Sequence, residues 1–207
     1  MNSLPSLRNE MHQSSIDKMT RFRDKHLSGR RDLTIYDIGS QDVNGCYRSL
    51  FAEPSWRYVG IDMAAGENVD VVLGNPYSWR EVASSSADVV ISGQAFEHIE
   101  FFWMTMLEVE WVLKSNGICC IIAPAGGVEH RYPVDCWRFY PDGFQALARF
   151  ARLQTIEVAT QWESQDYADG SDIWQDSVLI ARKPSRTRTD ALKKAVRRRL
   201  LQFAGRV

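Results

Sequence analysis

The stretch Leu33-Thr-Ile-Tyr-Asp-Ile-Gly-Ser-Gln-Asp-Val-Asn-Gly45 decides the fold of this chain. Its first six residues are mostly β-branched or aromatic and alternate in polarity, which predicts a buried strand. The strand ends at Gly39, and Gly45 closes a polar turn. A strand that runs into a glycine-bearing turn is a usual way for an α/β sheet to present backbone N–H groups to a nucleotide-like ligand.

A second predicted strand strengthens this interpretation. It spans residues 56–62 and ends on Asp62, which follows Asp37 by 25 positions. That spacing is close to the one at which nucleotide-binding α/β folds place an acid on a pair of ribose hydroxyls. An ordinary βαβ unit with an acid at a strand end remains the alternative.

Four motifs in this order resemble the signatures of class I S-adenosylmethionine-dependent methyltransferases. They are Asp37-Ile-Gly39, Gly60-Ile-Asp62, residues 87–99 and residues 112–118. The resemblance extends from about Leu33 to Pro124. The first loop departs from the commoner family pattern, because residues 41–43 stand where glycine is more frequent. It also lacks the Gly-Lys-Ser/Thr ending of a phosphate-cradling loop, which argues against ATP or GTP.

The resemblance implies an α/β fold with a doubly wound, mostly parallel, Rossmann-like sheet of seven strands and an antiparallel last strand. We expect a methyltransferase domain over residues 33–184. Residues 1–32 are expected to form a helical extension over the cofactor pocket, with a helix at 14–27 capped by Ser14 or Ser15. The strands are expected at residues 33–38, 56–62, 69–73, 88–92, 117–123, 153–160 and 174–183, and further helices at 46–51, 97–112 and 144–151.

Composition limits the class of protein. The 207 residues carry a formal net charge of −1, which gives no general reason to expect a nucleic-acid partner. The four cysteines show no Cys-x-x-Cys spacing, so reduced thiols are the simpler interpretation. There is no apolar run of about 18 residues and no apolar signal core near the N-terminus. We therefore predict a cytoplasmic protein.

The C-terminal segment has a different character. Residues 186–207 contain eight lysines and arginines and one acid, with apolar residues at helical spacing. Residues 185–207 are therefore expected to form a basic amphipathic helix. It could rest on an anionic membrane surface or pack on a second subunit in a homodimer.

The resemblance also assigns cofactor-binding residues at the ends of the first four strands. They are Asp37, Gly39, Ser40, Asp62, Met63, Asn75, Gly93 and Gln94. The amide of Asn75 could hydrogen-bond the adenine ring, and Tyr77 or Trp79 could stack on it. Both aromatic rings are equally compatible with a place in the core.

The segment after the fifth strand, residues 125–143, combines glycines and prolines with charged and aromatic side chains. Loops at this end of the strands carry binding and catalytic groups, so we expect an acceptor pocket here. Phe139 is a further candidate wall of that pocket. The expected substrate-binding residues are Glu97, Arg131, Tyr132, Trp137, Arg138 and Tyr140.

Transfer of a methyl group to an alcohol requires alignment of two centres and removal of a proton. We expect His130 to be the general base, assisted by Asp135, with His98 as the second choice. Alternatively, His130 is a surface imidazole bonded to Glu129 or Asp166, and His98 supports the start of a helix. The remaining candidates, His12 and His26, are interpreted as surface residues.

The expected function is O-methylation of a sugar or glycan hydroxyl by S-adenosyl-L-methionine. Aromatic faces beside carboxylates suit a sugar, because its C–H face stacks on rings and its hydroxyls donate to acids. Methylation of a phenolic or other small metabolite is the first alternative, and a non-catalytic scaffold subunit is the second. RNA methylation is disfavoured by the neutral net charge. No metal is predicted, because scattered loop acids are more often only solvated; those acids are Asp135, Asp166, Asp169 and Asp172.

Overall fold

A computed structural model describes residues 12–185, 196, 198–201 and 203 of the chain. Seven strands form one sheet in the order β3-β2-β1-β4-β5-β7-β6. Only β7 runs against its neighbours β5 and β6, which confirms the predicted doubly wound, mostly parallel α/β sheet. The strands are β1 Thr34–Ile38, β2 Arg57–Asp62, β3 Val71–Val72, β4 Ala87–Gly93, β5 Leu113–Ala123, β6 Gln154–Thr160 and β7 Ser177–Arg182.

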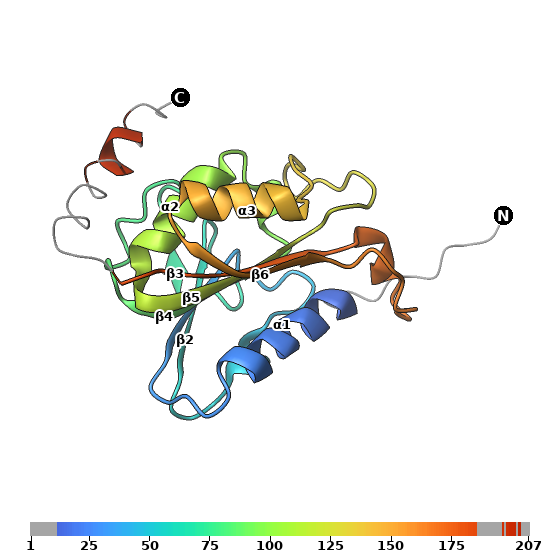
Figure 1. Cartoon of the computed structure of the whole chain (residues 1–207), viewed down its shortest axis with the longest axis horizontal. Helices are drawn as coiled ribbons and strands as arrows, with labels where there is room; N and C mark the ends of the chain where they lie inside the picture. Colours follow the sequence, from blue (N-terminus) through green and yellow to red (C-terminus); the bar gives the residue numbers. More distant parts are fainter. Residues whose placement is uncertain (1–11, 186–195, 197, 202, 204–207) are drawn as a thin grey trace.

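Helices cover both faces of this sheet (Figure 1). Helix α1, Gln13–His26, lies on one face, and α2, Phe102–Val112, and α3, Pro141–Phe150, lie on the other. Three short 3₁₀-helices complete the described elements: η1 Arg48–Phe51, η2 Phe96–His98 and η3 Ser171–Trp174.

The central strands β4 and β5 carry apolar residues on both faces, and helices cover both faces. In β4, Val90 belongs to the hydrophobic core under α2 and α3, while Ile91 belongs to the core under α1. Residues 119–122 of β5 alternate in the same way and are fully buried. The side chains of Met19 and Phe22 fill the α1 face, and their helical spacing explains why α1 could be predicted.

Several element boundaries differ from the sequence-based predictions. The third strand contains two residues instead of five, and residues 48–51 form a 3₁₀-helix. The helix expected from residue 97 is divided into η2 and α2. The carbonyl of Glu97 explains this division, because it accepts hydrogen bonds from the backbone N–H groups of Cys136 and Trp137 instead of one within a helix.

The expected cap of α1 was also wrong. His12 occupies the N-cap position without a side-chain cap bond, and Ser14 and Ser15 are buried in the first turn. The Ser14 hydroxyl donates to Asp176 at 2.6 Å, and the Ser15 hydroxyl shares a 2.6 Å hydrogen bond with the hydroxyl of Tyr47. These bonds attach the start of α1 to the edge of the sheet at which the strands β1 and β4 end.

The described part of the C-terminal segment, residues 196, 198–201 and 203, is helical, and the rest of residues 186–207 lies outside the described residues. The Arg198 guanidinium pairs with both carboxylate oxygens of Glu108 in α2 and lies 4.5 Å from the centroid of the Trp111 ring. Val196, Leu200 and Phe203 are exposed. Within the part of the chain that the structure describes, no helix has the length and apolar character needed to cross a bilayer.

Replacement of Arg198 by Ala should lower the free energy of unfolding by about 1–3 kcal/mol, because a fully buried carboxylate would lose a charge-assisted partner. Urea unfolding of the full chain measures this change. Arg199→Ala is the matched control, because this substitution removes the same charge from an exposed side chain. Equal stability of the two variants would mean that the Arg198 contact contributes nothing.

Candidate functional site

The strand order places a candidate site at the carboxyl ends of β1 and β4. In the sheet, β2 pairs with one side of β1 and β4 pairs with the other side. The direction in which the chain winds therefore reverses between β1 and β4. Ligands of open α/β sheets bind at such reversals, where the loops diverge. Gly39 follows β1 and Gly93 ends β4, so both predicted glycines lie at this point.

Both glycines occupy positions without room for a side chain. Gly39 has a φ of +74°, and a Cβ there would lie 2.4 Å from the Cβ of Ala95. A Cβ on Gly93 would lie 1.9 Å from the hydroxyl oxygen of Tyr47. The two loops therefore approach each other closely above the sheet.

The carboxylate of Asp62 fixes the first loop. One oxygen accepts the backbone N–H of Gln41 at 3.0 Å, and the other accepts those of Met63 and Ala64 at 2.6 and 3.2 Å. Asn68 holds the same loop by donating to the carbonyl of Ser40 at 2.7 Å. The non-glycine residues of the first loop are thus held by hydrogen bonds to the loops that follow β2.

Asp37 lies beneath this loop and is almost completely buried. The Tyr58 hydroxyl donates a hydrogen bond to its carboxylate. Burial raises the pKa of Asp37 to about 7. The carboxylate of Asp37 therefore contacts other residues of the protein. The side chain of Met63, in contrast, is exposed.

Gln94 presents a polar atom without a partner at the end of β4. Its φ is +55°, and its amide nitrogen donates to Asp176 at 2.9 Å. The amide oxygen is buried and has no hydrogen-bond partner among the described residues. Asp176 also lies 3.9 Å from the ammonium of Lys18. A buried free acceptor at this position is available to a ligand donor.

The loop after β3 provides fewer candidate contacts for a cofactor than the sequence predicted. Trp79 is only 2% exposed and its indole N–H donates to the carbonyl of Pro76, so stacking on a ligand by Trp79 is excluded. Tyr77 is half-buried against Phe101. Asn75 is exposed, and its side-chain oxygen accepts the backbone N–H of Tyr77 at 2.7 Å.

The candidate bases His98 and His130 lie together, beside Glu97. The two imidazole rings meet edge to face with centroids 4.9 Å apart, and the Nε2 of His98 lies 3.7 Å from a carboxylate oxygen of Glu97. Glu97 is fully buried, and burial raises its pKa to about 8. Burial lowers the pKa of both histidines, which favours their neutral forms.

The loop after β5 is organised by Asp135. Its carboxylate receives two hydrogen bonds from the Arg138 guanidinium, at 2.6 and 2.8 Å, and one from the backbone N–H of His130 at 2.8 Å. The guanidinium holds the pKa of Asp135 well below its usual range. The Nδ1 of His130 lies 3.4 Å from the same carboxylate. Asp135, and neither Glu129 nor Asp166, is therefore the carboxylate beside His130.

His12, which was interpreted as a surface residue, is half-buried and lies close to this cluster. Its ring stacks on Trp174 with centroids 5.4 Å apart, and Trp174 in turn lies 4.5 Å from His130. His26, in contrast, lies at the other end of α1 against Phe22. Trp174 and Asp176 were not identified from the sequence, because no short motif contains them and they reach the site only through the path of β7.

An aromatic hollow of about 490 Å³ adjoins this loop. Its lining includes three of the six predicted substrate residues, namely Trp137, Arg138 and Tyr140. The predicted residues Arg131 and Tyr132 lie outside it, and both are exposed. The lining is completed by Phe102, Phe139, Asp142 and Gly143.

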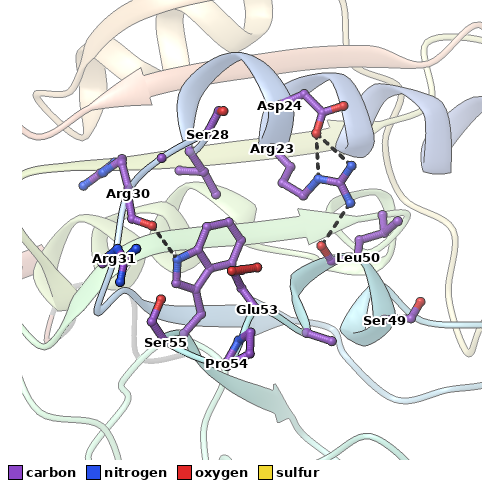
Figure 2. Close-up of a pocket in the computed structure, with 14 residues that line it drawn as sticks. Arg23, Asp24, Ser28, Arg30, Arg31, Ser49, Leu50, Glu53, Pro54 and Ser55 are labelled. Carbon is purple, nitrogen blue, oxygen red and sulfur yellow. Dashed lines mark hydrogen bonds and ion pairs between the residues drawn. The ribbon is translucent and has the colours of Figure 1, made fainter.

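A second hollow, of about 660 Å³, lies at the opposite edge of the sheet (Figure 2). It is bounded by residues 27–31 and 52–56, which precede β1 and β2. Arg23 at its wall already pairs with Asp24 and donates to the carbonyl of Leu50. We assign the functional site to the carboxyl edge, where the loops with free polar atoms converge.

Comparison with known proteins identifies the fold. Residues 37–121 match the family described as a methyltransferase domain. No curated protein matches the sequence. Among solved structures, the 1,6-didemethyltoxoflavin-N1-methyltransferase of Burkholderia thailandensis, determined with S-adenosylhomocysteine, has a TM-score of 0.62 at 14% identity, over 84% of this chain and 80% of that one.

Two further structures show the range of proteins with this fold. The CurJ carbon methyltransferase has a TM-score of 0.59 at 14% identity; the match covers 82% of this chain but only 53% of CurJ. The 4+2 cyclase SpnF has a TM-score of 0.62 at 13% identity, over 84% and 83% of the two chains. The chain therefore has the class I methyltransferase fold, and the fold alone does not specify the acceptor atom.

The buried Asp37 should make stability depend on pH. Its stabilising contribution is complete below the ordinary carboxyl pKa near 4 and is lost as the pH rises through about 7, because the folded protein retains the proton longer. Relative to the native chain, Asp37→Asn should gain up to about 1.4 kcal/mol per pH unit between these limits. Urea unfolding at pH 5, 6, 7 and 8 measures the gain.

The exposed Asp166→Asn is the control for loss of one negative charge. An Asp37→Asn difference that stays constant over this pH range would show that Asp37 is ionised in the folded protein.

Proposed function

We propose that this chain is an S-adenosylmethionine-dependent methyltransferase that methylates a hydroxyl oxygen of a sugar or glycan. The match of residues 37–121 to the methyltransferase domain carries the reaction class. The choice of oxygen rests on the imidazole of His130 beside Asp135, because an alcohol must lose its proton as the new bond forms.

The residues at the carboxyl edge fit the cofactor. S-adenosylmethionine, when bound, supplies an electrophilic methyl group on a sulfonium. The partnerless amide oxygen of Gln94 suits its ammonium group. Asp62 accepts three N–H groups, and a carboxylate has about four acceptor sites, so it retains capacity for a ribose hydroxyl. Gly39, Ser40, Met63, Asn75 and Gly93 remain our candidates for the rest of the cofactor surface.

The loop after β5 would prepare the acceptor. His130 takes the hydroxyl proton, and Asp135 stabilises the imidazolium that forms. Arg138 keeps Asp135 ionised and fixed through two hydrogen bonds. His98 stays the second candidate base, since it lies on the other side of the same small cluster.

The aromatic hollow supports a ring-shaped acceptor. Trp137 and Tyr140 supply faces on which the C–H side of a sugar can stack, while Asp142 and Arg138 supply an acceptor and donors for hydroxyl groups. A phenolic metabolite is the runner-up, because the same rings stack on a planar acceptor. For the exposed apolar side chains of the C-terminal helix, contact with a membrane surface or with a second copy of the chain stays a prediction.

Calorimetric titration with S-adenosylhomocysteine tests the cofactor assignment. The native chain should bind with a micromolar Kd, and Asp62→Ala should weaken binding at least tenfold, because it removes both a ribose acceptor and the anchor of Gln41. Asp62→Asn keeps an acceptor oxygen and should show an intermediate loss. Circular dichroism confirms that each variant is folded. Absence of binding by the native chain would refute the cofactor proposal.

Replacement of His130 by Gln tests the proton acceptor. Turnover of a glycoside acceptor should fall by about 10²- to 10⁴-fold, while affinity for S-adenosylhomocysteine stays within a few-fold. Glu129→Ala is the control, because Glu129 belongs to the same loop but pairs with Arg131 at the surface. Activity of the His130 variant within a few-fold of the native value would eliminate it from this role.

A further inference from the structure

The side chain of Glu97 is buried without a hydrogen-bond partner among the described residues. Its exposed fraction is 0%, and neither carboxylate oxygen has a hydrogen-bond partner within residues 12–185 or the other described positions. Its backbone is fixed in place, because its carbonyl accepts the N–H groups of Cys136 and Trp137 at 2.8 and 3.2 Å. A buried carboxylate without donors is unfavourable unless a cation or a proton accompanies it.

The groups that face Glu97 are electron-pair donors. A ring nitrogen of His98, a ring nitrogen of His130 and a Glu97 oxygen all lie within 4.8 Å of one another. The Nε2 of His98 is 3.7 Å from the carboxylate, too far for a strong hydrogen bond between them. The three donor groups thus converge on one small volume.

The tautomer of His98 follows from its other nitrogen. Nδ1 is hydrogen-bonded to the carbonyl of Val134, and a carbonyl only accepts, so Nδ1 carries the proton. The lone pair of Nε2 therefore faces the carboxylate of Glu97. A backbone carbonyl that fixes the unused nitrogen of a histidine is a usual outer contact of a metal ligand.

His130 has a carboxylate beside its ring, although its Nδ1 makes no hydrogen bond within the described residues. Its Nδ1 lies 3.4 Å from Asp135, which is held by Arg138. His98 and His130 come from the loops after β4 and β5, and loops can adjust more readily than strands. Donors at about 2.1 Å from a metal are roughly 3 to 3.4 Å apart, so donors that now lie within 4.8 Å of one another would have to approach by up to about 1.8 Å.

We propose that Glu97, His98 and His130 form a binding site for a divalent first-row transition metal such as Zn²⁺. Two imidazoles and one carboxylate suit Zn²⁺, Fe²⁺ or Mn²⁺ better than Mg²⁺ or Ca²⁺, which prefer oxygen ligands. The site differs from the loop acids considered from the sequence: Asp135 supports a ligand, and Asp166, Asp169 and Asp172 are not in it.

The site has a consequence for the acceptor. Three protein ligands leave coordination positions open, and a hydroxyl bound to the metal ionises more readily than a free one. With metal bound, His130 would be a ligand and no longer the base; the metal would lower the pKa of the bound acceptor hydroxyl, whose proton would pass to solvent water. This consequence rests on the proposed function, whereas the metal site itself depends only on the three side chains.

Metal binding to the full chain, first stripped with a chelator, is the direct test. Titration with Zn²⁺ against a chromophoric chelator should show one ion per chain with a Kd of micromolar or tighter. Co²⁺ should produce visible absorption bands of a nitrogen- and oxygen-ligated ion. Glu97→Gln and His98→Gln should each weaken Zn²⁺ binding at least tenfold. His26→Gln and Cys136→Ser should retain it, which excludes unrelated histidines and the exposed thiol.

Thermal unfolding separates loss of a ligand from loss of the fold. The metal-free Glu97→Gln variant should melt at or above the temperature of the metal-free native chain, because a buried carboxylate becomes a neutral amide. Zn²⁺ should raise the melting temperature of the native chain and leave that of Glu97→Gln unchanged. The proposal would be overturned if the native chain did not bind Zn²⁺, or if Glu97→Gln and His98→Gln bound it as tightly as the native chain.

Titration of the same samples with S-adenosylhomocysteine distinguishes the two proposals. Zn²⁺ binding without S-adenosylhomocysteine binding would support the metal site and reject the cofactor assignment. The opposite result would reject the metal site and leave the cofactor assignment intact.

Discussion

The buried carboxylate of Asp176 joins parts of the chain that are distant in sequence. It accepts hydrogen bonds from Ser14 in α1 and from Gln94 after β4, and it lies at the start of the reversed strand β7. Its backbone carbonyl also accepts the N–H of Gln161 beyond β6. A buried carboxylate is unfavourable without donors, so these hydrogen bonds stabilise this mutual arrangement of the segments. This carboxylate thus holds the side-chain amide of Gln94, and with it the edge of the site at which we propose that the cofactor binds.

The loop after β5, in which we propose the base, is supported differently. Its internal order comes from Asp135 and Arg138, and its attachment to the sheet comes from the carbonyl of Glu97. The same residue thus ends a short helix with its backbone and faces two imidazoles with its side chain. A rigid sheet with a locally cross-linked loop at its carboxyl edge can hold reactive groups in place while loop sequence varies.

The central sheet was predictable from the sequence because residues 89–91 of β4 and 118–123 of β5 are apolar runs and β1 leads into a required glycine. The length of the edge strand β3 was overestimated. Val72 is 46% exposed, so little packing stabilises a longer pairing of β3 with β2. Proximity of His98 and His130 followed in part from their positions after neighbouring strands. The contacts of His12 with Trp174 could not be predicted, because they depend on how α1 meets the end of β7. The partnerless state of Glu97 is likewise a property of three-dimensional packing.

The contact between Tyr47 and Gly93 has an evolutionary consequence. The Tyr47 hydroxyl occupies the space that a side chain at position 93 would need, and it is also hydrogen-bonded to Ser15. A change of Gly93 is therefore compatible with this packing only together with a smaller residue at position 47, which in turn frees the Ser15 hydroxyl. The three positions are expected to vary as a set among descendants of this chain, although 78 residues separate the first from the last.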